Sequence, residues 1–194
     1  ETDGSYFFLS SKVLRFSGSY LATARLPRLL QPVLNRLSLQ TRAPSSAVVL
    51  DDNEVVIVAR GGAAGVLAYG LHLGARLPAH ATSTGQVLLA AKSRAELTTW
   101  MKGQTFARLT PSTLAAPAAL RARIAQVRAQ DWSQASEEHE VGVHALAVPL
   151  RNLQGQTVAA LNVVASVQGA APEAMLRDWL PALVEEARAL RSLL

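Results

Sequence analysis

Two pairs of apolar β-type segments, each joined by a short turn, constrain the fold of this chain more than any other feature. The first pair covers residues 47–50 and 55–59, and the second covers residues 144–150 and 157–167. Strands joined by so few residues pair antiparallel, because a parallel connection needs a crossover of about a dozen residues or more. The helical patterns lie between and around these pairs and do not alternate with single strands. The sequence therefore predicts an α+β fold with an antiparallel sheet, and it excludes a doubly wound parallel sheet.

Apolar residues at helical spacing predict the remaining elements. The predicted helices cover residues 13–24, 26–37, 82–91, 93–102, 115–130 and 176–190. Residues 66–73 form a third strand candidate, which Gly74 ends. Pro32 lies inside the second helical pattern, where a proline either kinks a helix or marks its true start.

Composition indicates a compact globular domain. The 194 residues are 49% apolar and 17% charged, which excludes intrinsic disorder, and they suffice to bury a sizeable core. The chain has no cysteine, which excludes a disulfide framework, a thiol nucleophile and a thiolate zinc site. Its apolar runs are far shorter than the ~20 residues of a membrane span, and its first residues are polar and acidic, unlike a signal peptide. We therefore expect a cytoplasmic protein with no membrane partner.

Basic residues are concentrated in the N-terminal part of the chain. Residues 1–42 hold six Lys or Arg and two acidic residues, whereas residues 43–194 hold thirteen basic and twelve acidic residues. An anionic partner such as nucleic acid would approach the basic end. A solvated helix face explains the same charges equally well, so charge alone does not predict contact with DNA.

Catalysis has little support in this sequence. It contains no phosphate-binding loop, no dinucleotide-binding glycine pattern, no zinc-protease motif and no nucleophile elbow. We therefore predict a protein that is not an enzyme and that uses no cofactor or metal. His139 lies in the acidic run 137–140, where a solvated turn is favoured over a metal site. The alternative, a small-molecule hydrolase or isomerase, would need His80 or His144 within hydrogen-bond reach of Glu138.

Two polar features stand out against apolar surroundings. Thr82, Ser83, Thr84 and Gly85 precede the apolar run of a buried helix, whose first turn leaves backbone N–H groups able to bind an anion such as a carboxylate. An ordinary N-cap is the alternative, and spacing alone favours it. Asn162 interrupts an apolar strand, so its amide either bonds a neighbouring loop or faces a cavity that receives a polar ligand.

Four stretches of this sequence resemble the C-terminal effector-binding domain of the IclR family of bacterial transcriptional regulators. They are RLPAHATSTGQVLLA (76–90), EEHEVGVHALAVPLRNLQGQTVAALNV (137–163), DDNEVVIVARG (51–61) and DGSYFFLSSKVLRFSGSYL (3–21). The last is similar to the final wing strand of a winged helix-turn-helix and the linker helix that follows it. Order and spacing are preserved over essentially the whole chain.

The resemblance implies a curved antiparallel sheet flanked by helices, related to GAF and profilin-like folds and preceded by the linker helix. Residues 1–24 would be the remnant of the wing plus the linker helix, and residues 25–194 the effector-binding domain. Members of the family bind small organic acids and form dimers or tetramers. They contact operator DNA through a winged helix-turn-helix, which would lie upstream of Glu1.

The resemblance also implies a binding site. The backbone amides of Ser83 and Thr84 would hold the effector carboxylate. Further pocket positions fall at Tyr69, Leu77, His80, Val143, Ala145, Asn162 and Val164. The resemblance places an acidic pocket residue of some relatives at Ala135 or Ser136, where this chain departs from the family pattern, so that contact is not carried over. The segments HATSTG and AALNV most resemble the subgroup that regulates aromatic-acid and β-ketoadipate catabolism, so the implied effector is an aromatic or dicarboxylic acid. A pure dimerisation module, with its pocket filled by its own side chains, remains the other alternative.

Overall fold

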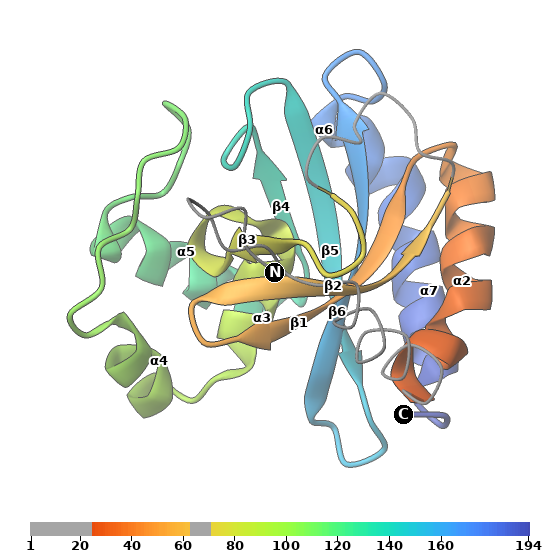
Figure 1. The fold of residues 1–194 in the computed structure, drawn as a ribbon, viewed down its shortest axis with the longest axis horizontal. Coiled ribbons are helices and arrows are strands. Elements are labelled where there is room, and N and C mark those ends of the chain that lie inside the picture. The colour runs from red at the N-terminus through yellow and green to blue at the C-terminus, as the bar shows by residue number, and fades with distance from the viewer. Residues whose placement is uncertain (1–24, 63–70) are drawn as a thin grey trace, which may run out of the picture.

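The computed structural model describes residues 25–62 and 71–194 (Figure 1). Six strands form one sheet in the order β3-β2-β1-β6-β5-β4, and every neighbouring pair is antiparallel. The strands are β1 (Ser45–Asp51), β2 (Glu54–Gly61), β3 (Arg76–Pro78), β4 (Ser133–Ser136), β5 (Val143–Arg151) and β6 (Thr157–Ser166). The sheet is strongly twisted, so that β1 and β2 run across β5 and β6 in this view. The predicted α+β fold with an antiparallel sheet is confirmed.

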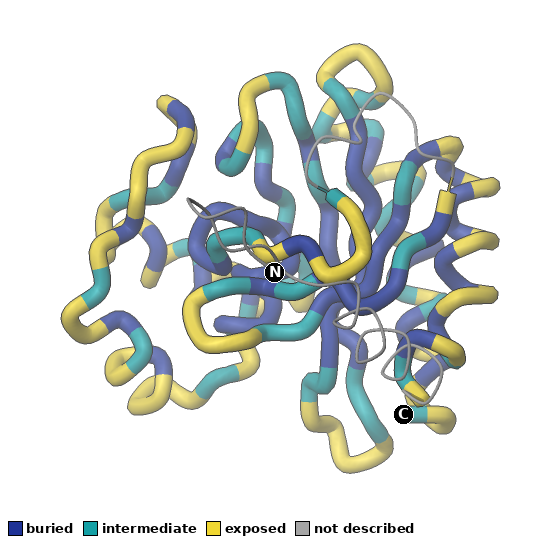
Figure 2. Tube along the Cα trace, viewed as in Figure 1, coloured by how far each residue is buried: buried dark blue, intermediate teal, exposed yellow. Residues whose placement is uncertain are grey.

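Helices cover both faces of this sheet. The helical elements are α2 (Arg25–Thr41), the 3₁₀ turn η1 (Ala79–Ala81), α3 (Ser83–Ala91), α4 (Arg94–Met101), α5 (Pro117–Gln130), α6 (Pro172–Ala174), the π-helical turn η2 (Met175–Trp179) and α7 (Leu180–Leu190). Helices α2 and α7 pack on one face, and α3 packs on the other with α5 behind it (Figure 1). The strands at the centre are therefore buried on both sides, whereas the outer turns of α2 are exposed (Figure 2). This burial explains why β5 and β6 are almost continuously apolar and do not alternate.

The two predicted hairpins are present, and they make up most of the sheet. In the first, Asp51 pairs with Glu54 across a tight turn in which Asp52 has a φ of 53°. In the second, β5 pairs with β6 over nearly its full length. A register shift between Ala47 and Val48 interrupts the β1–β2 ladder. β1 and β6 pair with each other and so join the two hairpins at the centre of the sheet.

Helix α2 packs its apolar stripe on β1 and β2. Leu30, Leu34 and Leu37 are fully buried, whereas Pro32 lies on the exposed side. The helix runs from Arg25 through Pro32, so of the two alternatives for this proline the structure excludes the helix start. Helix and strand approach closely where a Cβ atom on Gly61 would lie 2.4 Å from the Leu34 carbonyl carbon, which only glycine permits.

Three other predictions differ from the structure. The strand candidate 66–73 falls partly outside the described residues, and residues 71–73 form a bend and not a strand. Gly74, with a φ of 81°, turns the chain, so the third strand begins only at Arg76. The apolar pattern does not predict β4 at all, because its sequence SQAS is mostly polar. The final helical segment begins at Pro172, earlier than predicted, and contains a π-helical turn.

Several expectations lie outside the described residues. They are the wing strand expected within residues 3–21, the helix 13–24 and the division of the chain at residue 24. Within the residues that the structure does describe, no helix has the length and apolar character needed to cross a bilayer.

Candidate ligand-binding site

A cavity lies between the start of α3 and the face of the sheet formed by β1, β5 and β6. Its volume is about 60 Å³, and its wall is mostly apolar with a few polar groups. Seven of the predicted site residues line it: Leu77, Ser83, Thr84, Val143, Ala145, Asn162 and Val164. Tyr69 lies outside the described residues. The cavity beside Thr84 and Asn162 contradicts the alternative of a pocket filled entirely by its own side chains.

Strand geometry brings the four sheet residues of this site together. Residues two apart on a strand point to the same face, so Val143 and Ala145 of β5 share a face, as do Asn162 and Val164 of β6. The register pairs Ala145 with Val164 directly, so both pairs of side chains lie on one surface. The start of α3 lies over that surface and closes the cavity.

Thr82 is the N-cap of α3. Its Oγ1 accepts a hydrogen bond from the Gly85 amide at 3.1 Å, and its carbonyl accepts one from the Gln86 amide at 3.0 Å. The ordinary N-cap reading is therefore correct for Thr82. The cap does not occupy the amides of Ser83 and Thr84, which start the helix at the cavity wall.

Ser83 carries an unsatisfied hydroxyl at this helix start. The residue is 1% exposed, and its Oγ has no hydrogen-bond partner among the described residues. A buried hydroxyl without a partner is unfavourable, and it is expected to bond a ligand where one enters. Together with the partial positive charge of the first helical turn, it makes this end of the cavity suited to an anion.

Gly85 allows the helix start to approach the preceding turn. A Cβ atom at this position would lie 2.0 Å from the carbonyl oxygen of Ala79, which is far inside contact distance. The backbone of α3 therefore packs directly on η1. This close contact fixes where the amides of Ser83 and Thr84 lie relative to the sheet.

Of the two alternatives for Asn162, the structure shows the cavity and not the loop contact. Its Oδ1 accepts a hydrogen bond from the Ser46 hydroxyl at 2.5 Å, so its partner is the neighbouring strand β1 and not a loop. Both residues also line the cavity. They form a polar spot on an otherwise apolar wall.

Two carboxylates that sequence reasoning did not place in the site, Glu138 and Glu140, line the cavity, and Glu138 is the buried one. It is 4% exposed and lines the cavity. Arg123 of α5 donates to its Oε1 at 2.8 Å, and Gln86 of α3 donates to its Oε2 at 2.7 Å. Burial raises the pKa of the Glu138 carboxyl, and the charge and hydrogen bond of Arg123 oppose that rise. The predicted solvated acidic turn is wrong for this residue.

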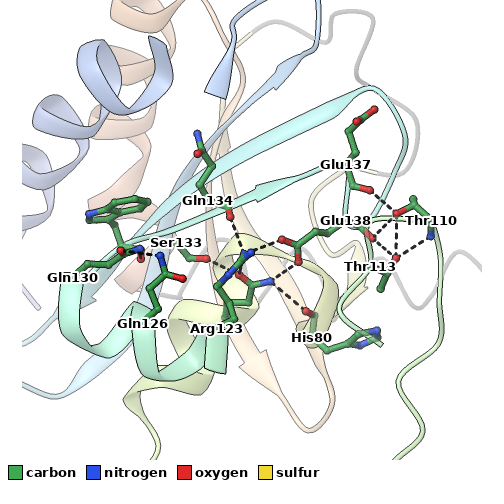
Figure 3. A network of polar contacts seen from close by, with 12 residues as sticks. His80, Thr110, Thr113, Arg123, Gln126, Gln130, Ser133, Gln134, Glu137 and Glu138 are labelled. Carbon is green, nitrogen blue, oxygen red and sulfur yellow. Dashed lines mark hydrogen bonds and ion pairs between the residues drawn. The ribbon is translucent and has the colours of Figure 1, made fainter. Parts of the chain in front are cut away.

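Figure 3 shows the polar network around Arg123. The same guanidinium also donates to the Gln134 carbonyl at 3.0 Å, and the Ser133 hydroxyl donates to Gln86 Oε1 at 2.6 Å. The backbone carbonyl of Glu138 accepts a hydrogen bond from Thr113 at 2.6 Å. The network therefore ties α3, α5 and β4 together beneath one wall of the cavity. The sequence of α5 contains three arginines, and its apolar pattern does not indicate that Arg123 is the one that enters this network.

His139 also lines the cavity, and it is half-buried. Burial lowers the pKa of its imidazole, the charge of Glu140 opposes this, and His80 adds to the lowering. Within residues 25–62 and 71–194, no three His, Asp or Glu side chains come together in a way that could hold a metal ion.

The imidazoles of His80 and His144 do not face the cavity. The His80 ring hydrogen-bonds the Ala107 carbonyl at 3.0 Å and packs 5.2 Å from the Phe106 ring. His80 is not among the residues that line the cavity, and its role as a ligand-binding residue stays a prediction. His144 lies between two cavity residues on β5 and therefore points to the opposite face. Neither ring hydrogen-bonds Glu138, whose two oxygens take Arg123 and Gln86, so the histidine–carboxylate pair of the hydrolase alternative is not assembled.

Comparison with known proteins identifies close relatives of the whole chain. It is 44% identical to the Pca operon regulatory protein of Acinetobacter baylyi over 198 aligned residues, which cover 100% of this chain and 71% of that protein. It is also 44% identical to the p-hydroxybenzoate hydroxylase transcriptional activator of the same organism, covering 73% of that protein.

Solved structures agree with these relatives. The inducer-binding domain of the Acinetobacter PobR transcription factor, a double mutant in complex with 3-hydroxybenzoic acid, has a TM-score of 0.83 and 42% identity, and the match covers 87% of this chain and 98% of that one. The Thermotoga maritima IclR structure has a TM-score of 0.84 at 19% identity, which is a likeness of fold. Residues 18–191 match the family described as bacterial transcriptional regulator IclR, C-terminal. This chain therefore belongs to the IclR family of bacterial transcriptional regulators and carries its C-terminal domain.

Proposed function

We propose that this domain senses a small aromatic carboxylic acid and regulates transcription of genes for aromatic-acid catabolism. The observation that carries the proposal is the cavity at the start of α3, where the buried Ser83 hydroxyl has no partner within the described chain. The relatives named above regulate the Pca operon and p-hydroxybenzoate hydroxylase, and one related domain binds 3-hydroxybenzoic acid.

In this proposal the effector carboxylate accepts hydrogen bonds from the Ser83 hydroxyl and from the amides of Ser83 and Thr84. Such bonds to a charged acceptor contribute about 1.5–3 kcal/mol each. The ring lies against the apolar wall that includes Val143 and Val164. A ring hydroxyl would meet the polar spot formed by Ser46 and Asn162.

The size of the cavity adds a conformational step. Its volume of about 60 Å³ is smaller than the ~150 Å³ of an engineered cavity that accepts benzene. An aromatic ring therefore enters only as the lining side chains move apart. A ligand that binds the opened state better than the closed one shifts the population between them, and a coupling of about 1–3 kcal/mol is typical of such regulation.

The remaining parts of the proposal concern the whole regulator. We expect a homodimer or tetramer that acts in the cytoplasm and contacts operator DNA through a winged helix-turn-helix upstream of Glu1. The linker helix at residues 13–24 would carry the effect of the opened cavity to that region. The basic excess of residues 1–42 is consistent with approach to DNA from this end.

A thermal-shift screen tests the effector. The compounds are protocatechuate, 4-hydroxybenzoate, β-ketoadipate, pyruvate and glyoxylate. At a hundred times its dissociation constant, a ligand stabilises the folded state by about 2.7 kcal/mol, which for a domain of this size raises the melting temperature by roughly 5–10 °C. We expect this shift from the aromatic acids. A response to β-ketoadipate alone would favour a dicarboxylic effector, and no response to any of the five would refute the proposed function.

The variant Ser83→Pro tests the amide contact. Ser83 is the first residue of α3, where proline is well tolerated, and Thr82 has the extended ψ of 144° that a residue before proline prefers. The substitution removes one amide donor and the hydroxyl, so we expect effector binding to be lost while the fold persists. Arg94→Pro is the matched control, because it places a proline at the first residue of α4, away from the cavity. Wild-type affinity in Ser83→Pro would contradict the contact.

A further inference from the structure

A second groove lies on the far side of the sheet from the sensing cavity. It is bounded by α7, by β5 and by the junction between α5 and β4, and its volume is about 310 Å³. The two sites share no lining residue. We propose that this groove is a second binding site, for an organic acid with a flat apolar body. The inference rests on the groove alone and goes beyond the function proposed above.

The positive charge of the groove comes from α7. Arg151 on the opposite wall forms a two-pronged ion pair with Asp131, with both contacts at 2.5 Å, so these two charges compensate each other. Arg188 makes no side-chain hydrogen bond or ion pair with any residue of the described chain. The Arg191 Nε donates to the Asn152 carbonyl at 3.3 Å. Its two Nη groups make no hydrogen bond with any described residue, so they can bind a ligand.

These two guanidinium groups can act on one ligand. Arg188 lies in the last turn of α7, and Arg191 is the C-cap residue of that helix with helical φ and ψ angles of −56° and −36°. The spacing of three residues brings the two side chains together on one face, and both line the groove. Guanidinium groups present planar pairs of N–H donors that match the two oxygens of a carboxylate. The arrangement therefore favours an acid group at the α7 side of the groove.

The floor of the groove is apolar. Val148, Pro149 and Ala187 are buried there, and the half-buried ring of Trp132 forms part of the wall. The Trp132 indole N–H donates no hydrogen bond to any described residue. An inorganic anion would leave this apolar surface uncovered, whereas an aromatic carboxylate would cover it and satisfy the donors. The volume lies at the lower end of the ~300–1,000 Å³ that is common for small-molecule sites.

A titration that observes Trp132 directly tests the proposal. The probe is benzoate, and the readout is the ¹H–¹⁵N resonance of each indole N–H, with that of Trp132 assigned from the variant Trp132→Phe. The titration is done in the Ser83→Pro variant, so that occupancy of the sensing cavity does not contribute. We expect the Trp132 resonance to shift and saturate. A response in Ser83→Pro separates this site from the proposed function, because either one can fail without the other.

Three comparisons decide the outcome. The double variant Arg188→Gln, Arg191→Gln should weaken the response at least tenfold, because it removes the charged donors. Arg121→Gln removes the same charge from an exposed position of α5 outside the groove and should leave the response unchanged. No Trp132 shift, an equal shift in the double variant, or inorganic phosphate binding as tightly as benzoate would each overturn the assignment.

Discussion

The variant Ser83→Ala is expected to make the domain more stable and a weaker binder. In the wild type, the Ser83 hydroxyl is buried without a partner among the described residues, and such a group costs about 1–3 kcal/mol. Removing the oxygen relieves this cost and leaves only a small void. We expect the free energy of unfolding to rise by about 1 kcal/mol, which corresponds to a melting temperature higher by roughly 2–4 °C for a domain of this size. Loss of a hydrogen bond to a carboxylate should weaken affinity by about 10- to 150-fold.

The control is the other serine at a helix start. The Ser93 hydroxyl is the N-cap of α4 and accepts from the Glu96 amide at 3.2 Å. Ser93→Ala should therefore lower stability by about 0.5–2 kcal/mol and leave effector affinity unchanged. Urea unfolding measures the first quantity, and calorimetric titration with 4-hydroxybenzoate measures the second. If Ser83→Ala were destabilising and bound the acid as tightly as the wild type, the hydroxyl would have its partner inside the protein and the reasoning would fail.

Three further predictions concern the surroundings of the site. Gly85→Ala places a methyl group 2.0 Å from the Ala79 carbonyl oxygen, so it should displace α3, lower stability by at least about 1–3 kcal/mol and abolish effector binding, as measured by unfolding and titration. Arg123→Ala leaves the Glu138 carboxylate buried without its ion partner and should cost about 3–5 kcal/mol in urea unfolding; a loss below 1 kcal/mol would refute the role of the pair. Because burial raises the pKa of Glu138 above the ordinary 4.5, the folded chain holds this proton to higher pH than the unfolded chain, and the contribution of Glu138 to stability falls as pH rises from about 4.5 through the raised value. Melting temperatures between pH 4 and pH 7 should show this fall in the wild type and not in Glu138→Gln.

The parts of the fold that follow from local pattern could be predicted from the sequence. The two hairpins and the start of α3 depend on short-range signals, namely turn residues, strand-forming runs and a capping threonine. The strand β4 could not be found this way, because SQAS has no apolar pattern and is held by its pairing with β5. The bend before Arg76 likewise depends on the left-handed conformation of Gly74 and not on the apolar residues around it.

In the candidate site, too, some positions could be predicted from the sequence and others could not. The resemblance to the IclR family gave the positions of Val143, Ala145 and Asn162. Alternation along each strand, together with the β5–β6 register, brings the three residues to one surface. The burial of Glu138 could not be anticipated, because its carboxylate is held by Arg123 of α5 and Gln86 of α3, which meet only when these two helices pack together. The position of the His80 ring could not be anticipated either. Its ring finds a backbone carbonyl and an aromatic neighbour outside the cavity, and nothing in the local sequence indicates them.

The junction at the centre of the sheet has a mechanical consequence. Four residue pairs hold one hairpin against the other. They join residues Ser45–Val48 of β1 to residues Val163–Ala160 of β6. The cavity spans this short seam, with Ser46 on one side and Asn162 on the other. A molecule held there contacts both halves of the domain and resists their sliding past each other, as a removable cross-link would. A bound effector would then make the whole sheet more rigid, including strands that do not contact the ligand.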